Sequence, residues 1–189
     1  MIPSGNNSIR FRRESGFTLI EIIMVIVLLG IVSFTAATLL YQGAKSFESL
    51  DVRKDLTEGA TLAIERITRE TRLVRCTTAG NSCSPQAADI LTPVTSIDEI
   101  RFVNINGAGR GFRYDSAVRS VKLRQGSDAA DPEDALAADV SAFTIEYLKR
   151  DGTAAAAVSE VWRIDISFTL AKGAESVDYK FGVHPRSFR

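Results

Sequence analysis

The feature that most constrains this chain is an almost purely apolar segment, residues 17–40, which begins close to the N-terminus. Glu21 is the one charged side chain within it. As an α-helix the segment would be about 36 Å long, enough to cross a hydrocarbon layer of roughly 30 Å. We therefore predict that residues 17–40 form a transmembrane helix.

A short polar segment, residues 1–16, precedes the apolar run and carries Arg10, Arg12 and Arg13 against a single acid, Glu14. Positively charged flanks stay on the cytoplasmic side of a membrane, so the rest of the chain is predicted to lie on the far side. The alternatives are a simple uncleaved anchor and a secretory signal peptide, whose apolar region is normally about 7–15 residues long.

Glu21 distinguishes this segment from an ordinary membrane anchor. An ionised carboxylate in a spanning helix costs about 2.5–3.5 kcal/mol at the centre of the bilayer and less near its edge. The helix dipole favours an anion near the N-terminus only modestly. We therefore expect Glu21 to pair with a cation, although the leader arginines all lie before Gly16.

The sequence from Gly16 to Glu21, GFTLIE, with the basic residues before it and the apolar run after it, resembles the type IV prepilin class. This class comprises type IV pilins, minor pilins and type II secretion pseudopilins. The resemblance implies that a prepilin peptidase cuts between Gly16 and Phe17 and N-methylates Phe17. It also implies that Glu21 meets the new amine of a neighbouring subunit and so sets the register of assembly, which agrees with the preference of charges in lipid for each other.

Two further stretches are similar to particular branches of this class. Residues 61–70 resemble the corresponding helix in minor pilins of the mannose-sensitive-haemagglutinin type and in J-type pseudopilins, and residues 183–186 resemble the closing residues of many minor pilins. Thr38 occupies a position at which major subunits often carry proline. The resemblance therefore favours a minor subunit.

The helix is predicted to continue beyond the membrane as an amphipathic periplasmic half, residues 41–75. No proline lies between Pro3 and Pro85 to interrupt it. Glu65 and Arg69, four residues apart, are typical of a solvent-exposed flank. Apolar and small side chains recur at spacings of three and four and predict one buried face: Leu56, Ala60, Ala63, Ile64, Ile67, Thr71 and Val74.

The remainder, residues 76–189, is predicted to be a β-rich periplasmic domain. Apolar and polar residues alternate along residues 162–170 and again along 177–183, which predicts an antiparallel pair of strands. Further strands are predicted within residues 143–147, 100–106 and 112–123, the last broken near Asp115. A sheet of about four to six strands covering the amphipathic half-helix gives the α+β fold class, which is also the arrangement of pilins.

Cys76 and Cys83 are predicted to form a structural disulfide, because disulfides persist in the periplasm and no nearby histidine or further cysteine completes a metal site. The acidic segment 126–139 carries oxygen ligands of the kind that bind Ca²⁺. A solvated acidic loop is the favoured interpretation, because the spacing matches no known calcium motif. The glycine-rich segment 107–111 is predicted to connect two strands.

Composition narrows the remaining function classes. Basic and acidic residues both number 23, which argues against a broad nucleic-acid-binding face. The single histidine, His184, lies near a tail predicted to be exposed, so neither a histidine-dependent nucleophilic site nor a Cys/His zinc site can be assembled. We therefore predict no catalytic residues, no metal and no cofactor.

The sequence thus predicts a structural subunit, a minor pilin or pseudopilin, of a type IV pilus or type II secretion filament. Its expected partners are the inner membrane, prepilin peptidase, other pilin or pseudopilin subunits and the assembly platform, with no nucleic acid. The expected location is the inner membrane, single-pass with a periplasmic C-terminal domain, and then the filament. The alternatives are a tip-displayed adhesin or binding module and a membrane-anchored periplasmic protein outside any filament, an enzyme included.

Overall fold

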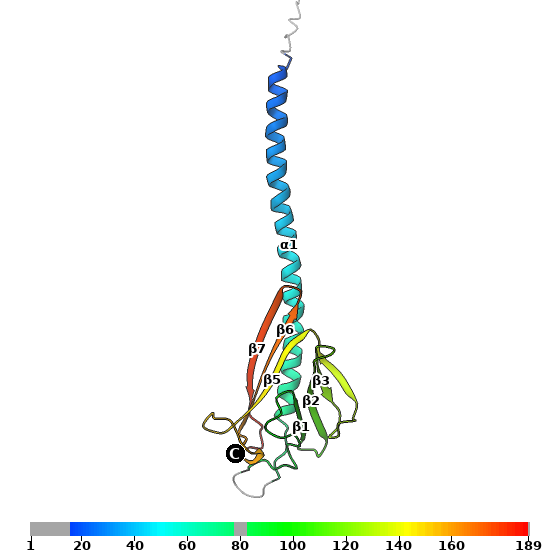
Figure 1. Ribbon diagram of the computed structural model, residues 1–189, viewed down its shortest axis with the longest axis vertical. Helices are drawn as coiled ribbons and strands as arrows, with labels where there is room; N and C mark the ends of the chain where they lie inside the picture. The colour runs from blue at the N-terminus through cyan, green and yellow to red at the C-terminus, as the bar shows by residue number, and fades with distance from the viewer. Residues whose placement is uncertain (1–15, 78–82, 189) are drawn as a thin grey trace, which may run out of the picture. The chain divides into compact units, whose positions relative to one another are not determined.

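The computed structural model describes residues 16–77 and 83–188 (Figure 1). The predicted leader, residues 1–16, lies outside the described part of the chain except for Gly16. The first element is a 53-residue helix, α1 (Leu19–Thr71). The elements that follow in the described residues are β1 (Glu99–Val103), β2 (Gly109–Asp115), β3 (Ser120–Arg124), β4 (Glu133–Ala137), β5 (Val140–Leu148), a short 3-10 helix η1 (Val158–Glu160), β6 (Arg163–Lys172) and β7 (Glu175–Val183).

The chain divides into two units, Met1–Phe47 and Glu48–Arg189. The described part of the first unit consists of three residues without regular secondary structure followed by the beginning of α1, and its side chains are almost all exposed. The second unit contains the remainder of α1 and all the strands.

Within the second unit, α1 buries the face that the sequence predicts. Leu56, Ala60, Ala63 and Ile67 are each at most 3 % exposed, and Thr71 is fully buried. Their spacing of three and four places them on one stripe, and the small alanines allow the helix to approach the strands closely. The prediction of a buried helical face is confirmed, although Ile64 lies at its margin and is only half-buried.

The helix ends earlier than the predicted residue 75. Thr71 is its last residue, and Val74 is buried in an isolated antiparallel bridge with Asn104. The N–H of Arg75 donates to the carbonyl oxygen of Val103 at 2.8 Å. The helical pattern continues in the sequence, but these backbone partners at the end of β1 and directly after it draw the chain into an extended conformation instead.

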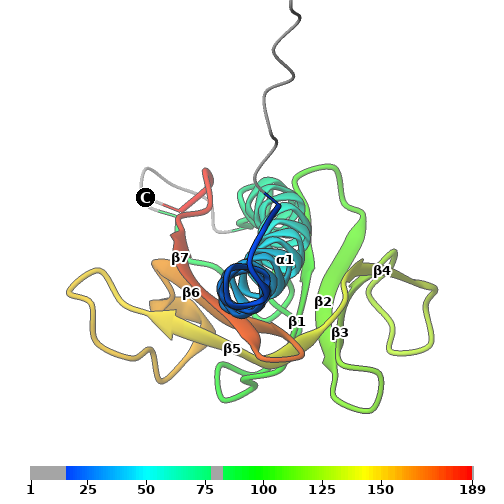
Figure 2. The same cartoon turned by 90° about the horizontal axis from the view of Figure 1, so that it is seen from above.

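The strands form two antiparallel sheets, ordered β1-β2-β3-β4 and β5-β6-β7, where the sequence predicted one sheet. The α+β class with one long helix and antiparallel strands is confirmed. A single hydrophobic cluster joins the buried face of α1 to both sheets. Figure 2 shows β1–β4 and β5–β7 around the part of α1 that belongs to the second unit.

The interpretation of residues 126–139 as a loop is wrong in part, because β4 lies within it. Glu133 of β4 pairs in register with Arg124 of β3, and a shift in register follows between Val121 and Lys122. Residues 133–137 form a strand because Glu133 is engaged by cations of the same sheet. Its carboxylate pairs with Arg124 on β3 and with Arg113 on β2, so it does not face water alone.

The predicted exposed tail is also corrected. Phe188 is only 3 % exposed and belongs to the buried cluster. The N–H of Arg186 donates to the carbonyl oxygen of Arg72 at 3.1 Å, and Ser187 Oγ donates to the carbonyl oxygen of Val74 at 2.5 Å. The tail is therefore docked on the segment that follows α1.

Candidate assembly site

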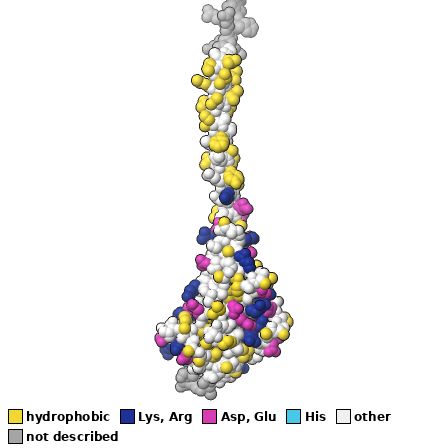
Figure 3. All heavy atoms as spheres, in the orientation of Figure 1, with side chains coloured by type: hydrophobic (Ala, Val, Ile, Leu, Met, Phe, Trp, Pro, Cys, Tyr) yellow, Lys and Arg dark blue, Asp and Glu magenta, His cyan; other side chains and the backbone are white. Residues whose placement is uncertain are grey.

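The described part of the first unit presents apolar side chains on every side of the helix. Phe17 is 79 % exposed and Leu19 78 %, and none of the most apolar stretch of α1 is buried. Figure 3 shows these hydrophobic side chains gathered along this part of the helix. Burial of apolar surface is favourable by about 25 cal/mol per Å², so this surface requires lipid or other helices around it.

Among the described helices, α1 alone is long and apolar enough to cross a membrane. Two hydroxyl groups of its apolar part form hydrogen bonds within the helix. Thr35 Oγ1 donates to the carbonyl oxygen of Val32 at 2.9 Å, and Thr38 Oγ1 donates to that of Thr35 at 2.8 Å. Such local bonds remove the need for water, which a hydrocarbon environment does not supply.

The residues of the predicted processing site lie at the start of α1. Gly16, Phe17 and Thr18 precede the helix and are exposed, with open space around Gly16. The carbonyl oxygen of Thr18 accepts the first helical bonds, from the N–H groups of Glu21 at 3.1 Å and Ile22 at 3.3 Å. The cleavage and methylation assigned to Gly16 and Phe17 remain predictions.

Glu21 lies in the first turn of α1, where the helix dipole favours a negative charge. Within residues 16–77 and 83–188, no cation forms an ion pair with it. An anion in an apolar helix without a partner in its own chain is poised for a partner from outside. The register role of Glu21 remains a prediction.

The segment after α1 is fastened by a disulfide between Cys76 and Cys83, whose Cα atoms lie 6.2 Å apart. The predicted disulfide is confirmed. Beside it, the fully buried carboxylate of Asp89 accepts hydrogen bonds from Thr77 Oγ1 at 2.6 Å, from the N–H of Gln86 at 3.0 Å and from Arg75 Nε at 2.9 Å.

These hydrogen bonds set the charge state of Asp89. Burial by itself raises the pKa of this carboxyl, but the donors Thr77, Gln86 and Arg75 outweigh it and hold the pKa below its ordinary value. Asp89 could not be identified from the sequence, because no local spacing signals that an acid of this segment receives four hydrogen-bond donors.

A second buried acid, Glu70, joins α1 to the first sheet. Its carboxylate lies 3.0 Å from Arg66 Nη2 on the same helix and 3.8 Å from Arg110 Nε on β2. The helical spacing in the sequence points to Glu65 and Arg69 instead. Both of those are exposed, and they form no ion pair with each other among the described residues.

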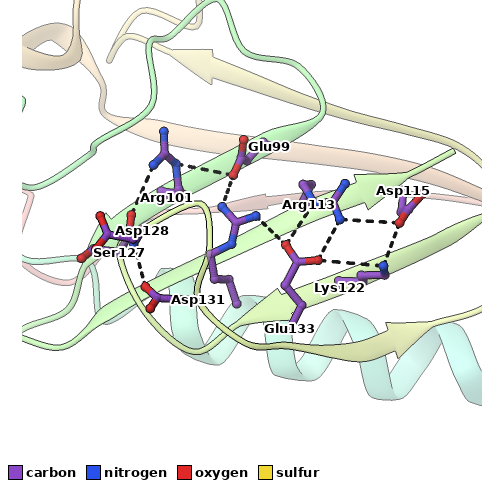
Figure 4. A network of polar contacts seen from close by, with 10 residues as sticks. Glu99, Arg101, Arg113, Asp115, Lys122, Ser127, Asp128, Asp131 and Glu133 are labelled. Carbon is purple, nitrogen blue, oxygen red and sulfur yellow. Dashed lines mark hydrogen bonds and ion pairs between the residues drawn. The ribbon is translucent and has the colours of Figure 1, made fainter. Parts of the chain in front are cut away.

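The outer face of the first sheet carries a network of paired charges (Figure 4). Strand alternation turns Phe112 and Leu123 into the core, so the neighbouring pair Arg113 and Lys122 points outward. Their partners come from β4 and β2: Arg113 donates to Glu133 at 2.8 and 3.0 Å, and Lys122 Nζ lies 2.7 Å from Asp115.

Arg124 is at the centre of this network and is only 3 % exposed. Its guanidinium donates to Glu99 and to Glu133, each at 2.5 Å. The pKa of Glu133 is lowered to about 2, first because Arg113 donates hydrogen bonds to its carboxylate and then because Arg124 does, against the opposing effect of burial. Lys122 likewise holds the pKa of Asp115 below its ordinary value.

The segment between β3 and β4 crosses this outer face. Arg101 Nη1 donates to the carbonyl oxygen of Ser127 at 3.3 Å, and the N–H of Asp128 donates to Asp131 Oδ2 at 2.7 Å. Gly109 of β2 lies beneath the crossing: a Cβ added there would be 2.3 Å from the backbone nitrogen of Ser127. The glycine-rich segment thus has two roles. Gly107 lies in the connection between β1 and β2, and Gly109 leaves room for the backbone of Ser127 to pass close by.

The chemistry of the described residues is that of structural ion pairing. The carboxylates of the outer face are engaged by guanidinium and ammonium groups, and no group of three or more His, Cys, Asp and Glu residues able to hold a metal occurs in the described part of the chain. His184 is exposed and contacts Trp162 in a tilted arrangement, with 4.2 Å between the ring centroids, and the Arg150 guanidinium lies 4.9 Å from the centroid of the same indole.

Comparison with known protein families gives a match at the beginning of the chain. The family model described as the prokaryotic N-terminal methylation motif matches residues 11–37. No curated protein sequence matches the chain. The matched residues include Gly16, Phe17 and Glu21 together with most of the exposed apolar helix, and they support a type IV pilin-like family.

Proposed function

Because the N-terminal methylation motif points to a type IV pilin-like protein processed by prepilin peptidase, we propose that this chain is a structural subunit, a minor pilin or pseudopilin, of a type IV pilus or type II secretion filament. The observation that carries the proposal is the exposed apolar helix whose single acid, Glu21, has no ion-pair partner in the described chain. A surface of this kind is suited to burial among other helices of the same type.

Prepilin peptidase would cut between Gly16 and Phe17. Gly16 to Thr18 lie outside the helix and are exposed, which gives a peptidase access to the backbone. Cleavage would remove the leader, residues 1–16, and leave Phe17 as the N-methylated first residue. The mature chain would then consist of a transmembrane half-helix (residues 17–40), an amphipathic half (residues 41–75) and a periplasmic β-rich domain (residues 76–189).

The amine released at Phe17 would provide the cation that Glu21 lacks. In hydrocarbon both groups gain by pairing, because neither can be solvated by water. If the amine comes from the neighbouring subunit, the pair forms at one axial offset only. Glu21 would thereby set the register in which subunits enter the filament.

The subunit would be anchored in the inner membrane with its folded domain in the periplasm. The Cys76–Cys83 disulfide supports this location, since disulfides persist in the periplasm and are rare in the cytosol. Thr38, placed where major subunits often carry proline, supports a minor subunit, and residues 61–70 are similar to the minor pilins and J-type pseudopilins named above.

Mass spectrometry of the membrane fraction and of sheared filaments tests the processing step. We expect a chain that begins at methylated Phe17 in filaments, and a Gly16→Leu variant that accumulates uncut in the membrane. A filament-associated chain that still carries residues 1–16 would contradict the proposal.

A Glu21→Val variant tests assembly. The substitution removes a charge from the apolar helix, so membrane insertion should persist while incorporation into filaments falls. Glu146→Gln, which removes an exposed acid from the β5 strand, is the control and should be incorporated normally. Equal incorporation of Glu21→Val and the control would mean that Glu21 has no role in register.

A further inference from the structure

Three arginines of the second unit converge without partners. The side chains of Arg69, Arg72 and Arg186 form no ion pair and no hydrogen bond within the described residues. They line one open groove of about 370 Å³, together with Glu65, Thr68 and Leu73. Their behaviour contrasts with that of the charged face of the first sheet, where cations and anions neutralise each other.

The fold creates this arginine groove (Arg69, Arg72 and Arg186) from distant parts of the sequence. Arg69 lies in the last turn of α1, and Arg72 directly follows its last residue, Thr71, with its N–H donating to the carbonyl oxygen of Thr68 at 3.0 Å. Docking of the tail adds the third arginine, because the N–H of Arg186 donates to the carbonyl oxygen of Arg72 at 3.1 Å. Three like charges against the single acid Glu65 leave the groove positive and repel one another until an anion neutralises them.

The same helix carries a matching set of unpartnered anions. Glu48, Asp51 and Asp55 are exposed and have no ion pair within the described residues. Their spacing of three and four residues places them on one line, which we call the acidic stripe.

The acidic stripe and the arginine groove lie on the same side of α1. Asp51 and Arg69 are 18 residues apart, which is five full helical turns at about 3.6 residues per turn, and this places them on one line about 27 Å apart along the axis. The two sets are too far apart to neutralise each other within one chain. A second copy, displaced along the helix axis, could bring opposite charges together.

We propose that the arginine groove of one copy of this chain receives the acidic stripe of a second copy in the assembled filament. This inference rests on the proposed function and adds to it a contact between the folded domains. The contact joins two different surfaces. A copy whose groove is occupied still has a free stripe, and a copy whose stripe is occupied still has a free groove. Further copies can therefore be added at both ends, which produces an open filament. Charge complementarity fixes the relative orientation and the axial offset of the two copies, which the packing of apolar helices alone specifies less well.

Charge reversal in the full-length chain, expressed with its assembly machinery, tests the contact. We expect Arg69→Glu with Arg72→Glu, and separately Asp51→Arg with Asp55→Arg, each to lower incorporation into sheared filaments by about fivefold to tenfold, since several surface ion pairs become repulsive together. All four substitutions in one chain should restore incorporation to within about twofold of wild type, because the opposite charges then meet again. Co-expression of the two doubly substituted chains should also restore it, in mixed filaments.

Arg53→Glu is the matched control, because Arg53 is an exposed arginine of α1 on the opposite side from the stripe and should tolerate reversal. All variants should retain normal membrane abundance and the Cys76–Cys83 disulfide. Normal incorporation of both reversed variants would overturn the inference while leaving the proposed function intact. Loss only on reversal of the arginines would also overturn it and would assign the groove to a different acidic partner. Failure of the wild-type chain to enter any filament would instead refute the proposed function.

Discussion

The guanidinium of Arg75 lies 2.9 Å from Asp89, Nε to Oδ1, at the point where the chain has left α1 and begins to run along the first sheet. Asp89 is fully buried, and it also accepts hydrogen bonds from the backbone N–H groups of Thr77 and Gln86. Asp89 therefore holds the chain on both sides of the Cys76–Cys83 disulfide, at Arg75 and Thr77 before the loop and at Gln86 after it.

Replacement of Asp89 by Ala should destabilise the second unit by about 3 kcal/mol, because several buried donors lose their acceptor together. Urea unfolding of the full chain in detergent, followed by the fluorescence of its single tryptophan, Trp162, measures the change. Asp98→Asn is the control, because the Asp98 carboxylate is exposed just before β1, and it should change the free energy of unfolding by less than about 0.5 kcal/mol. Equal stability of the two variants would mean that the anchor contributes nothing.

The ion-pair network around Glu133 predicts a specific dependence of stability on pH. The folded-state pKa of Glu133 is about 2 against an ordinary value of 4.5, so its contribution is complete above pH 4.5 and disappears as the pH falls toward 2. Glu133→Gln should be less stable than wild type at neutral pH, by up to about 3 kcal/mol, because Arg113 and Arg124 lose their anion.

The difference in unfolding free energy between wild type and Glu133→Gln should therefore shrink between pH 4.5 and pH 2. Glu146→Gln removes an exposed partner of Lys180 and should show a small difference at every pH. A gap between wild type and Glu133→Gln that stays constant through this pH range would contradict the assignment.

Gly109 should be intolerant of a side chain. An added Cβ would lie 2.3 Å from the backbone nitrogen of Ser127, so Gly109→Ala must displace the segment that crosses the sheet and should destabilise the domain by about 2 kcal/mol. Gly59→Ala is the matched control: its Cβ would meet open space within α1, and the substitution should stabilise the helix by about 0.5–1 kcal/mol. A neutral Gly109→Ala variant would show that the crossing segment does not pack as described.

The Cys76–Cys83 disulfide closes a short loop and should stabilise the fold by about 2 kcal/mol. A Cys76→Ala, Cys83→Ala double variant should therefore unfold at lower urea concentration, and wild type in reductant should behave like the variant. If reductant left the unfolding midpoint of wild type unchanged, the bond would be stabilising nothing.

Much of the fold could be predicted from the sequence because its signals are local. A continuous apolar run without proline dictates a long exposed helix, and a three-and-four spacing selected Leu56, Ala60, Ala63 and Ile67 as its buried face. Strict alternation likewise predicted β6 and β7. Such periodicities reflect the geometry of a single element, and no distant residue is needed to interpret them.

The misplaced elements all depend on contacts distant in sequence. An acidic composition suggested a loop where β4 forms, because the arginines that pair with Glu133 lie on other strands. The predicted helix is too long because the partners of Val74 and Arg75, Asn104 and Val103, lie about 30 residues further along the chain. The sequence predicts an exposed tail because nothing near Phe188 indicates the distant apolar residues with which it is buried.

The residues of the candidate site also fall into those that the sequence identifies and those that only the tertiary structure reveals. Gly16, Phe17 and Glu21 were identified by sequence alone, since the motif is contiguous and its chemistry depends on spacing along one helix. The burial of Asp89, the centring of Arg124 between two acids, and the meeting of Arg186 with Arg72 were decided only by the tertiary structure. The physical reason is that desolvation and charge pairing depend on distance in space, which a one-dimensional pattern of residues does not contain.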